Sequence, residues 1–233
     1  CLLILGASVG LALDGFVPII EMQFADFVSC GFNQIVNNIA KTHYRWNESL
    51  NITIRMPYGG GMSAGPFHSQ SPESWFFHTP GLKIVAPSSP FDAKGLLNAS
   101  IEDPNPVLYF EHKYMYRNIK GLVPNDYYNI KIGKADIKKT GTDVSIITYG
   151  MGVHWALDIA NKLENDNISI EVIDLRSLIP WDKNLVEESI SKTNRVLILH
   201  EANLTGGIGA EISAHISEKC FKYLDAPVMR LGA

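Results

Sequence analysis

Apolar runs separated by amphipathic segments extend along the first half of the chain. Short runs rich in β-branched residues predict buried strands, and apolar positions about 3.6 residues apart predict helices. The predicted strands are residues 16–22, 51–55, 82–86 and 106–111. The predicted helices are residues 26–44 and about 90–102, the second preceded by a serine cap. Strands separated by helices favour a parallel sheet covered on both faces.

The same rhythm returns in the second half, after a polar stretch at about residues 112–142. Predicted strands occupy residues 143–148, 168–173 and 196–200, and predicted helices occupy about residues 150–163 and 208–219. The sequence therefore predicts an α/β protein with two parallel-sheet domains. The expected boundaries are 1–120 for the first domain, 121–142 for a connection and 143–233 for the second domain.

The two ends of the chain suggest a fragment. Residues 1–5 are apolar, small residues follow, and an Asp14-Gly15 turn stops the run, which is too short to span a bilayer. We expect a buried helix whose small residues let it approach a neighbour. Because the chain begins inside this helix and stops just after a predicted strand near residue 231, we expect it to be incomplete at both ends.

Composition fits a globular protein and argues against some partners. The 233 residues are 46% hydrophobic and 19% charged, which allows a sizeable core. A net charge of −4 gives nucleic-acid binding no electrostatic support. Three cysteines, Cys1, Cys30 and Cys220, fit no metal or redox spacing and favour a reducing compartment.

The longest stretch without a secondary-structure signal is the glycine-rich segment 57–72. Loops of this length in compact domains are often functional. His68 lies near its end, beside Ser69 and Gln70, and histidine can exchange a proton near neutral pH. An ordinary solvated loop histidine is the alternative, and composition does not decide between the two.

Polar residues also follow the first predicted strand. Glu21 ends it and Asp26 comes soon after. In an open parallel sheet, ligands gather at the carboxyl ends of the strands. Asp26 could equally cap the following helix, and Phe27 could be ordinary core. The run Gly206, Gly207 and Gly209 looks like a phosphate loop but lacks the lysine, so we interpret it as a tight turn from strand to helix.

Taken in order, ten segments resemble the beta subunit of the thiamine-diphosphate-dependent 2-oxo acid dehydrogenases. The matching segments are EMQFADF at 21–27, NQIVN at 33–37, IRMP at 54–57, HSQSPE at 68–73, PGLKIV at 80–85, DAKGL at 92–96, EDPNP at 102–106, VIDLR at 172–176, IPWD at 179–182 and HEANLTGG at 200–207. The ordered set covers nearly the whole chain and is far more specific than any single motif.

The resemblance implies a thiamine-type pyrimidine-binding domain followed by a transketolase-type C-terminal domain. It implies an α2β2 assembly with a beta–beta contact, in which the alpha subunit holds the diphosphate and magnesium and the beta subunit contacts the aminopyrimidine ring. The expected reaction is oxidative decarboxylation of a 2-oxo acid and acyl transfer to lipoyl on an acyltransferase component. No nucleic acid or membrane partner is expected. The compartment would be the bacterial cytoplasm or, in a eukaryote, the mitochondrial matrix.

Carried over residue by residue, the resemblance makes His68 the active-site histidine and places the Phe27 ring against the aminopyrimidine. It also implies a structural potassium ion, because hard cations take oxygen ligands. The residues that match this site are Leu50, Ile52, Thr53, Ser100, Asp103 and Asn105. For Asp103 the alternative is a simple helix-end turn before Pro104.

One position departs from the family pattern. The family has a glutamate, which activates the cofactor, five residues before the glycine matched by Gly6, and that position here is Cys1. A thiol cannot do the work of a carboxyl group there, so we expect that the chain as given does not activate thiamine diphosphate. Either the end of the sequence is corrupted or this copy has lost the residue.

Residues 23–27 and 43–46 look more like branched-chain enzymes than pyruvate enzymes. The alternatives are a pyruvate or acetoin dehydrogenase beta subunit, a non-catalytic assembly fragment, and the C-terminal half of a transketolase or deoxyxylulose-phosphate synthase. The His68-Ser-Gln-Ser context argues against the last of these.

Overall fold

The computed structural model describes residues 1–233, which form two compact units. The first comprises Cys1–Ile132 with Leu178–Pro180, and the second comprises Gly133–Ser177 with Trp181–Ala233. The stretch just before Ile132 packs on the first unit, where Lys94 and Asn98 donate hydrogen bonds to backbone carbonyls between residues 124 and 128.

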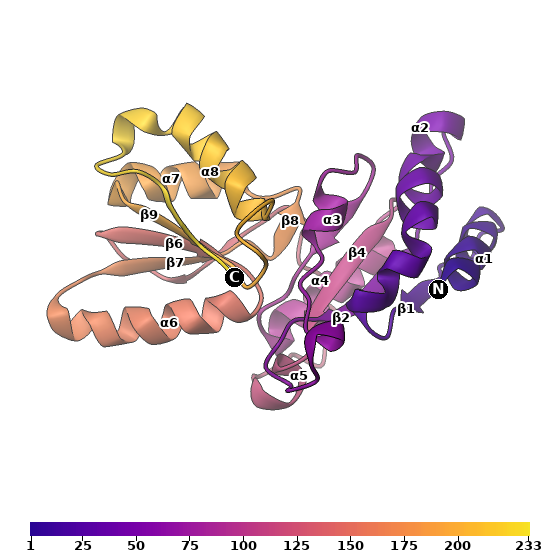
Figure 1. The fold of residues 1–233 in the computed structure, drawn as a ribbon, viewed down its shortest axis with the longest axis horizontal. Helices are drawn as coiled ribbons and strands as arrows, with labels where there is room; N and C mark the ends of the chain where they lie inside the picture. The colour runs from indigo at the N-terminus through magenta and orange to yellow at the C-terminus, as the bar shows by residue number, and fades with distance from the viewer. The chain divides into compact units, whose positions relative to one another are not determined.

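The first unit is built on a five-stranded sheet of order β1-β2-β4-β3-β8 (Figure 1). The strands are β1 (Ile19–Glu21), β2 (Thr53–Tyr58), β3 (Lys83–Val85), β4 (Val107–His112) and β8 (Ser177–Ile179). β1, β2, β4 and β3 pair in parallel, so their carboxyl ends share one edge of the sheet. All six residues of β4 are buried, as expected for a central strand covered on both faces.

The helix predicted at residues 26–44 is helical but irregular. It consists of a 3₁₀ stretch, Ala25–Gly31, a π stretch, Gln34–Asn38, a further 3₁₀ turn, Ile39–Lys41, and α2 (Thr42–Trp46). The Asn37 amide donates to Asn33 Oδ1 at 2.8 Å, and Thr42 Oγ1 donates to the Asn38 carbonyl at 2.8 Å. Side chains that bond locally in this way compete with the α-helical ladder, and this accounts for the departure from a regular helix.

The N-terminal helix corrects one expectation. It is helical over α1 (Leu2–Leu13), but only Leu5 and Ser8 are buried, and Leu3 is 83% exposed. A helix that is apolar all round can cover the unit with one face only, so the others stay open. The strand predicted at 16–22 is likewise only the three residues of β1, of which Ile20 alone is buried.

The remaining helices of this unit position its loops. They are α3 (Ser74–Phe77), α4 (Pro90–Glu102), α5 (Met115–Asn118) and the 3₁₀ turn Pro66–His68. Ser89 caps α4 as predicted, because its Oγ accepts the Asp92 N–H at 3.1 Å.

The second unit has a five-stranded sheet of order β10-β9-β6-β7-β5, in which only β5 is antiparallel. Its elements are β5 (Asp136–Lys139), β6 (Val144–Thr148), α6 (Met151–Leu163), a 3₁₀ turn (Glu164–Asp166), β7 (Ile170–Asp174), α7 (Lys183–Thr193), β9 (Val196–Leu199), α8 (Ile208–Lys219), a 3₁₀ turn (Phe221–Tyr223) and β10 (Met229–Leu231). Figure 1 shows α6 on one face of the sheet and α7 and α8 on the other. The predicted fold class, two parallel-dominated α/β sheets, is confirmed. The strands β5 and β8 and the helix α7 were not predicted.

Candidate functional site

The loop that carries His68 is closed at its base. The Gly59 N–H donates to the Gln70 carbonyl at 3.0 Å, so residues 59–70 leave the carboxyl end of β2 and return to it. Gly59 has φ +86°, and a Cβ there would lie 2.2 Å from Nε2 of His112. Only glycine fits this position, for its backbone conformation and for the close approach.

The structure brings His68 and Phe27 together, although the sequence separates them by a strand. Their ring centroids are 5.4 Å apart with an interplanar angle of 77°, and Phe24 meets the same imidazole at 5.9 Å. His68 is half-buried and Phe27 is 38% exposed. The imidazole is therefore neither buried in the core nor freely solvated: it is held edge-on between aromatic rings at the surface of the first unit.

A buried ion pair lies beneath this loop. Lys113 Nζ donates to the His68 carbonyl at 2.6 Å and lies 3.6 Å from Asp26 Oδ2. The other oxygen of Asp26 accepts the Gln70 N–H at 3.0 Å. Asp26 therefore holds the loop and does not cap a helix, so the cap interpretation is wrong. The sequence interpretation missed Lys113, although its place at the carboxyl end of a predicted strand was a usable signal.

A second charged group lies on the neighbouring strands β1, β2 and β4. Arg55 donates to both carboxylate oxygens of Glu111 at 2.9 Å and to Glu21 at 3.1 Å. The hydrogen bond to Glu111 is the main reason why the pKa of Arg55 is raised. Burial, followed by the charge of Glu111, raises the pKa of the neighbouring Tyr116. Arg55 and the two carboxylates thus form a network of charge-assisted hydrogen bonds across three strands.

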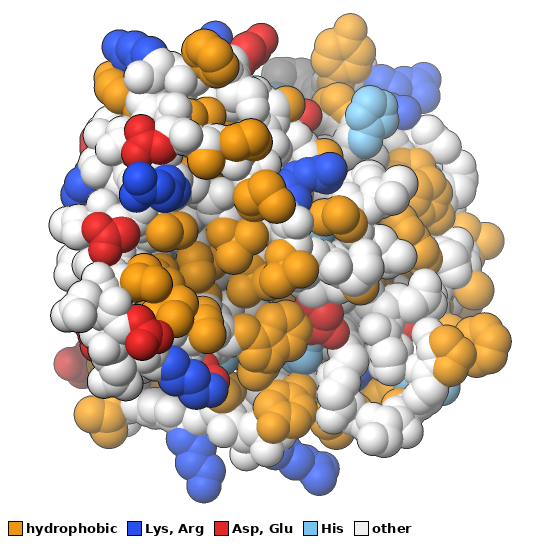
Figure 2. Space-filling model, turned by 60° about the vertical axis from the view of Figure 1, so that its left-hand side comes forward, with side chains coloured by type: hydrophobic (Ala, Val, Ile, Leu, Met, Phe, Trp, Pro, Cys, Tyr) orange, Lys and Arg blue, Asp and Glu red, His pale blue; other side chains and the backbone are white.

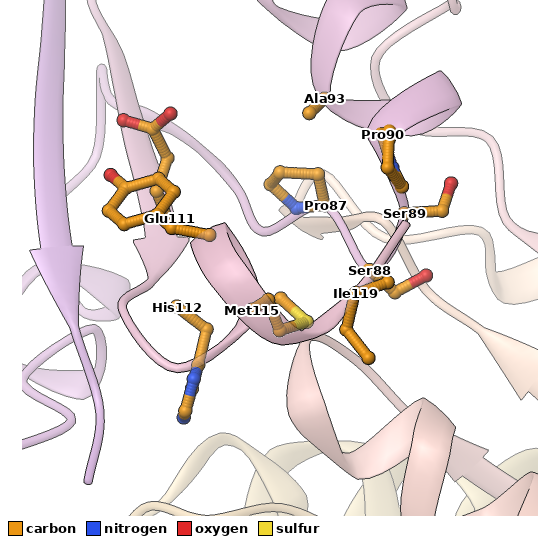
Figure 3. Close-up of a pocket in the computed structure, with 10 residues that line it drawn as sticks. Pro87, Ser88, Ser89, Pro90, Ala93, Glu111, His112, Met115 and Ile119 are labelled. Carbon is orange, nitrogen blue, oxygen red and sulfur yellow. The ribbon is translucent and has the colours of Figure 1, made fainter. Parts of the chain in front are cut away.

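A cavity of about 200 Å³ opens beside this network. Figure 3 shows Glu111 and His112, from the end of β4, on one side and Ser88, Ser89 and Pro90, from the start of α4 and the segment before it, on the other.

The segments predicted to hold potassium meet at the amino ends of β2 and β4. Thr53 lies opposite Val107 in the sheet, and the Ile52 carbonyl accepts the Val107 N–H at 2.9 Å. Leu50 is buried next to them and lines, with Asn105, a second cavity of about 490 Å³. Oγ1 of Thr53 is buried without a hydrogen-bond partner.

The helix-end side chains of that predicted site already have partners. Ser100 Oγ donates to the Leu96 carbonyl at 2.7 Å. Asp103 is the residue after α4. Its Oδ1 accepts the Asn105 N–H at 2.9 Å, and its Oδ2 is paired with Lys83. The Asp103 carboxylate thus forms the helix-end turn that was the alternative interpretation, and cation ligands would have to come mainly from carbonyl and hydroxyl oxygens.

Cys1 lies beside the segment that carries Phe27. It is exposed, and its carbonyl carbon is 3.7 Å from the place where a Cβ on Gly31 would be. Gly31 is the last residue of the 3₁₀ stretch that contains Phe27. The residue at position 1 therefore lies next to the end of the short helix that carries the Phe27 ring.

In the second unit, the run Gly206, Gly207 and Gly209 allows a tight turn and close packing against His200. Gly206 has φ +70° and α8 begins at Ile208, which gives the predicted tight turn. A Cβ on Gly207 or Gly209 would lie 2.8 or 2.7 Å from the His200 ring. Burial lowers the pKa of His200, whose Nε2 has no hydrogen-bond partner. Nowhere in the chain do three His, Cys, Asp or Glu side chains gather as metal ligands would.

Residues 3–118 match the family described as transketolase, pyrimidine binding domain, and residues 133–233 match transketolase, C-terminal domain. Among solved structures, a split gene transketolase described as an inactive beta4 tetramer aligns with a TM-score of 0.80 and 25% identity, over 98% of this chain and 70% of that one. None of the helices combines the length and apolar character needed to cross a membrane.

The curated relatives are dehydrogenase subunits. The chain is 52% identical to the 2-oxoisovalerate dehydrogenase subunit beta of Bacillus subtilis, over 98% of the chain and 71% of that protein. It is 50% identical to the mitochondrial counterpart of Dictyostelium discoideum, of which it covers 63%. It is 43% identical to the pyruvate dehydrogenase E1 component subunit beta of Staphylococcus aureus, of which it covers 71%. The chain thus spans roughly two thirds of the length of these relatives.

Proposed function

Because this chain belongs to the family of 2-oxo acid dehydrogenase beta subunits, we propose that it is the beta part of an enzyme that oxidatively decarboxylates a branched-chain 2-oxo acid and transfers the acyl group to lipoyl on an acyltransferase component. The Phe27–His68 pair carries the proposal. A half-exposed imidazole, fixed edge-on against an exposed aromatic ring at 5.4 Å, offers a proton-transfer group beside a platform for a flat ring.

Thiamine diphosphate is the cofactor of this family, and the residues present fit its pyrimidine end. The exposed ring of Phe27 can pack against a flat heterocycle. When bound, the cofactor stabilises the negative charge left by decarboxylation. His68 would hold and release a proton at its imidazole nitrogens during acyl transfer. We assign the diphosphate and its magnesium to the alpha partner.

The proposed assembly is an α2β2 heterotetramer with a beta–beta contact, served by a lipoyl-bearing acyltransferase. Exposed apolar side chains support a buried role in such an assembly. On α1, Leu3 is 83% exposed and Leu13 is 54% exposed. In a view that brings the left-hand side of Figure 1 forward, Figure 2 also shows hydrophobic side chains gathered across the middle of the face. Exposed apolar patches commonly mark subunit contacts. We place the enzyme in the bacterial cytoplasm or, in a eukaryote, the mitochondrial matrix.

Substrate preference tests the proposed function. In the assembly with its own alpha partner and with glutamate at position 1, we expect kcat/KM for 2-oxoisovalerate to exceed that for pyruvate by at least about tenfold, because the two extra methyl groups are bound in an apolar pocket. Steady-state kinetics with both acids measures the ratio. A preference for pyruvate rejects the branched-chain assignment. If the assembly turns over neither acid, the dehydrogenase function itself is contradicted.

We also propose the structural potassium ion, bound where residues 50–53 meet residues 100–105. The buried, unpartnered Thr53 hydroxyl and the neighbouring carbonyls of Leu50 and Ile52 support it, because potassium takes such oxygen ligands. At ten times its dissociation constant, potassium stabilises the fold by about 1.4 kcal/mol, which is roughly 3–6 °C in Tm for a chain of this size. Thermal unfolding in potassium and in tetramethylammonium chloride, at equal ionic strength, measures the difference.

Two variants separate this site from the ion pair beside it. Asp103→Asn should reduce the potassium effect by removing a negative charge near the ion. Lys83→Met, which removes the ammonium paired with Asp103, should preserve or enlarge it. Equal Tm values in the two salts for the unsubstituted chain would exclude the site.

A further inference from the structure

We propose that Lys113 and Asp26 are positioning residues that fix the imidazole of His68 against Phe27. The effect of this pair on catalysis rests on the proposed function, whereas its effect on the position of His68 does not. The pair lies under the loop, touches its backbone at two points and comes from two different elements of the first unit.

Lys113 is anchored to the sheet. It follows directly after β4, whose residues are all buried, and its N–H donates to the Tyr58 carbonyl at the end of β2 at 2.9 Å. Its side chain is only 7% exposed. Its ammonium donates to the carbonyl of His68 itself at 2.6 Å, and a charged donor makes such a bond strong. The position of His68 is thereby tied to the fully buried strand β4.

Asp26 completes the clamp from the other side. Its carboxylate is 1% exposed and is compensated by Lys113 at 3.6 Å. It accepts the N–H of Gln70 at 3.0 Å, two residues after the carbonyl that Lys113 holds. With bonds on both sides of Ser69, the backbone that carries the imidazole cannot rotate without breaking a bond to a buried charge.

The ring of Phe24 also restrains the side chain of His68. The Lys113 ammonium lies 4.6 Å from the Phe24 ring centroid, and Phe24 in turn contacts the His68 ring at 5.9 Å. The segment 61–67, by contrast, is exposed throughout, so the clamp supplies the contacts that join His68 to the buried part of the unit. Proton transfer needs such a fixed position, since a misplacement of about 1 Å can cost about 10²-fold in rate.

The test follows His68 by NMR in the full chain with ¹³C-labelled histidine. The protein has seven histidines, and loss of one signal in His68→Gln identifies the resonance. Phe24 and Phe27 displace this resonance through their ring currents. In Lys113→Met we expect the signal to move toward the position of a solvated histidine and to broaden. Lys113→Arg, which keeps a charged donor, should restore most of the displacement.

Lys83→Met is the matched control, because it breaks the other lysine–aspartate pair of the first unit, Lys83 with Asp103, at the opposite ends of the strands. Its His68 signal should stay in place. If Lys113→Met does not fold, Lys113→Gln is used, which keeps a polar group but is too short to reach the loop. An undisplaced His68 signal in a folded Lys113 variant overturns the proposal.

Activity provides a second and separate reading. In the assembled enzyme with glutamate at position 1, Lys113→Met should lower kcat for lipoyl acylation by about 10²-fold and leave KM for the 2-oxo acid nearly unchanged, because the residue acts through His68 and not on the substrate. If the NMR signal moves but no assembly shows turnover, the positioning role stands and the proposed function fails. A loss of kcat that Lys113→Arg does not rescue would contradict positioning.

Discussion

Replacing His68 with glutamine, in the assembled enzyme that carries glutamate at position 1, lowers the rate of lipoyl acylation by about 10²–10⁴-fold, which is the usual contribution of a positioned acid–base group. Glutamine keeps the size and the hydrogen-bonding ability of the side chain but cannot titrate. KM for the 2-oxo acid should change little, because the loss falls on proton transfer and not on binding. Single-turnover acylation of a lipoyl domain is the direct measurement.

The fold should tolerate this change. His68 is half-buried and its contacts are edge-on with aromatic rings, so the free energy of unfolding should change by less than about 1 kcal/mol. His78→Gln is the matched control, because His78 is an exposed histidine of the same unit. If His68→Gln keeps its acylation rate within twofold of the same assembly with His68 and with glutamate at position 1, His68 is not the acid–base group and the functional assignment of the loop is wrong.

Replacing Cys1 with glutamate has the opposite effect and converts an inactive assembly into an active one. The expected gain in decarboxylation is about 10²–10⁴-fold, because a carboxylate can accept a hydrogen bond from the aminopyrimidine and direct proton movement where a thiol cannot. Position 1 lies beside the Phe27 segment, within 3.7 Å of the Cβ site of Gly31, so a longer acidic side chain starts close to the proposed ring site.

Two controls isolate the charge. Cys1→Gln has the shape of the glutamate without its charge and should show no gain, and Cys30→Ser removes the other exposed thiol of the first unit and should change nothing. Equal turnover with cysteine and glutamate at position 1 would show that this position does not activate the cofactor. Inactivity of both, with thiamine diphosphate still bound, would favour a non-catalytic role in assembly.

Many of the strands, helices and loops depend on residues close together in the sequence and could therefore be predicted from it. The strands around residues 54, 84 and 108 are short apolar runs bounded by polar or turn-forming residues, so burial and β-propensity point the same way. The Ser89 cap is fixed by contacts three residues apart. The long glycine-rich loop stood out because nothing in it favours a helix or a strand.

Elements without a local signal were missed. β8 is three residues long and pairs in the sheet of the first unit, although the chain around it belongs to the second. The helix at residues 26–44 follows the correct period but bonds irregularly, because its asparagine and threonine side chains compete for backbone partners. The exposure of α1 depends on what covers it, which hydrophobic periodicity does not report.

The sequence by itself determined the alternation of strands and helices, the two sheets and the loop that carries His68, because each of these depends on residues that are close together in the sequence. The tertiary structure alone decided that His68 meets Phe27 and that Lys113, 45 residues away, holds its carbonyl. Parallel pairing is the physical reason: it aligns the carboxyl ends of distant strands at one edge and brings together side chains that no local pattern connects.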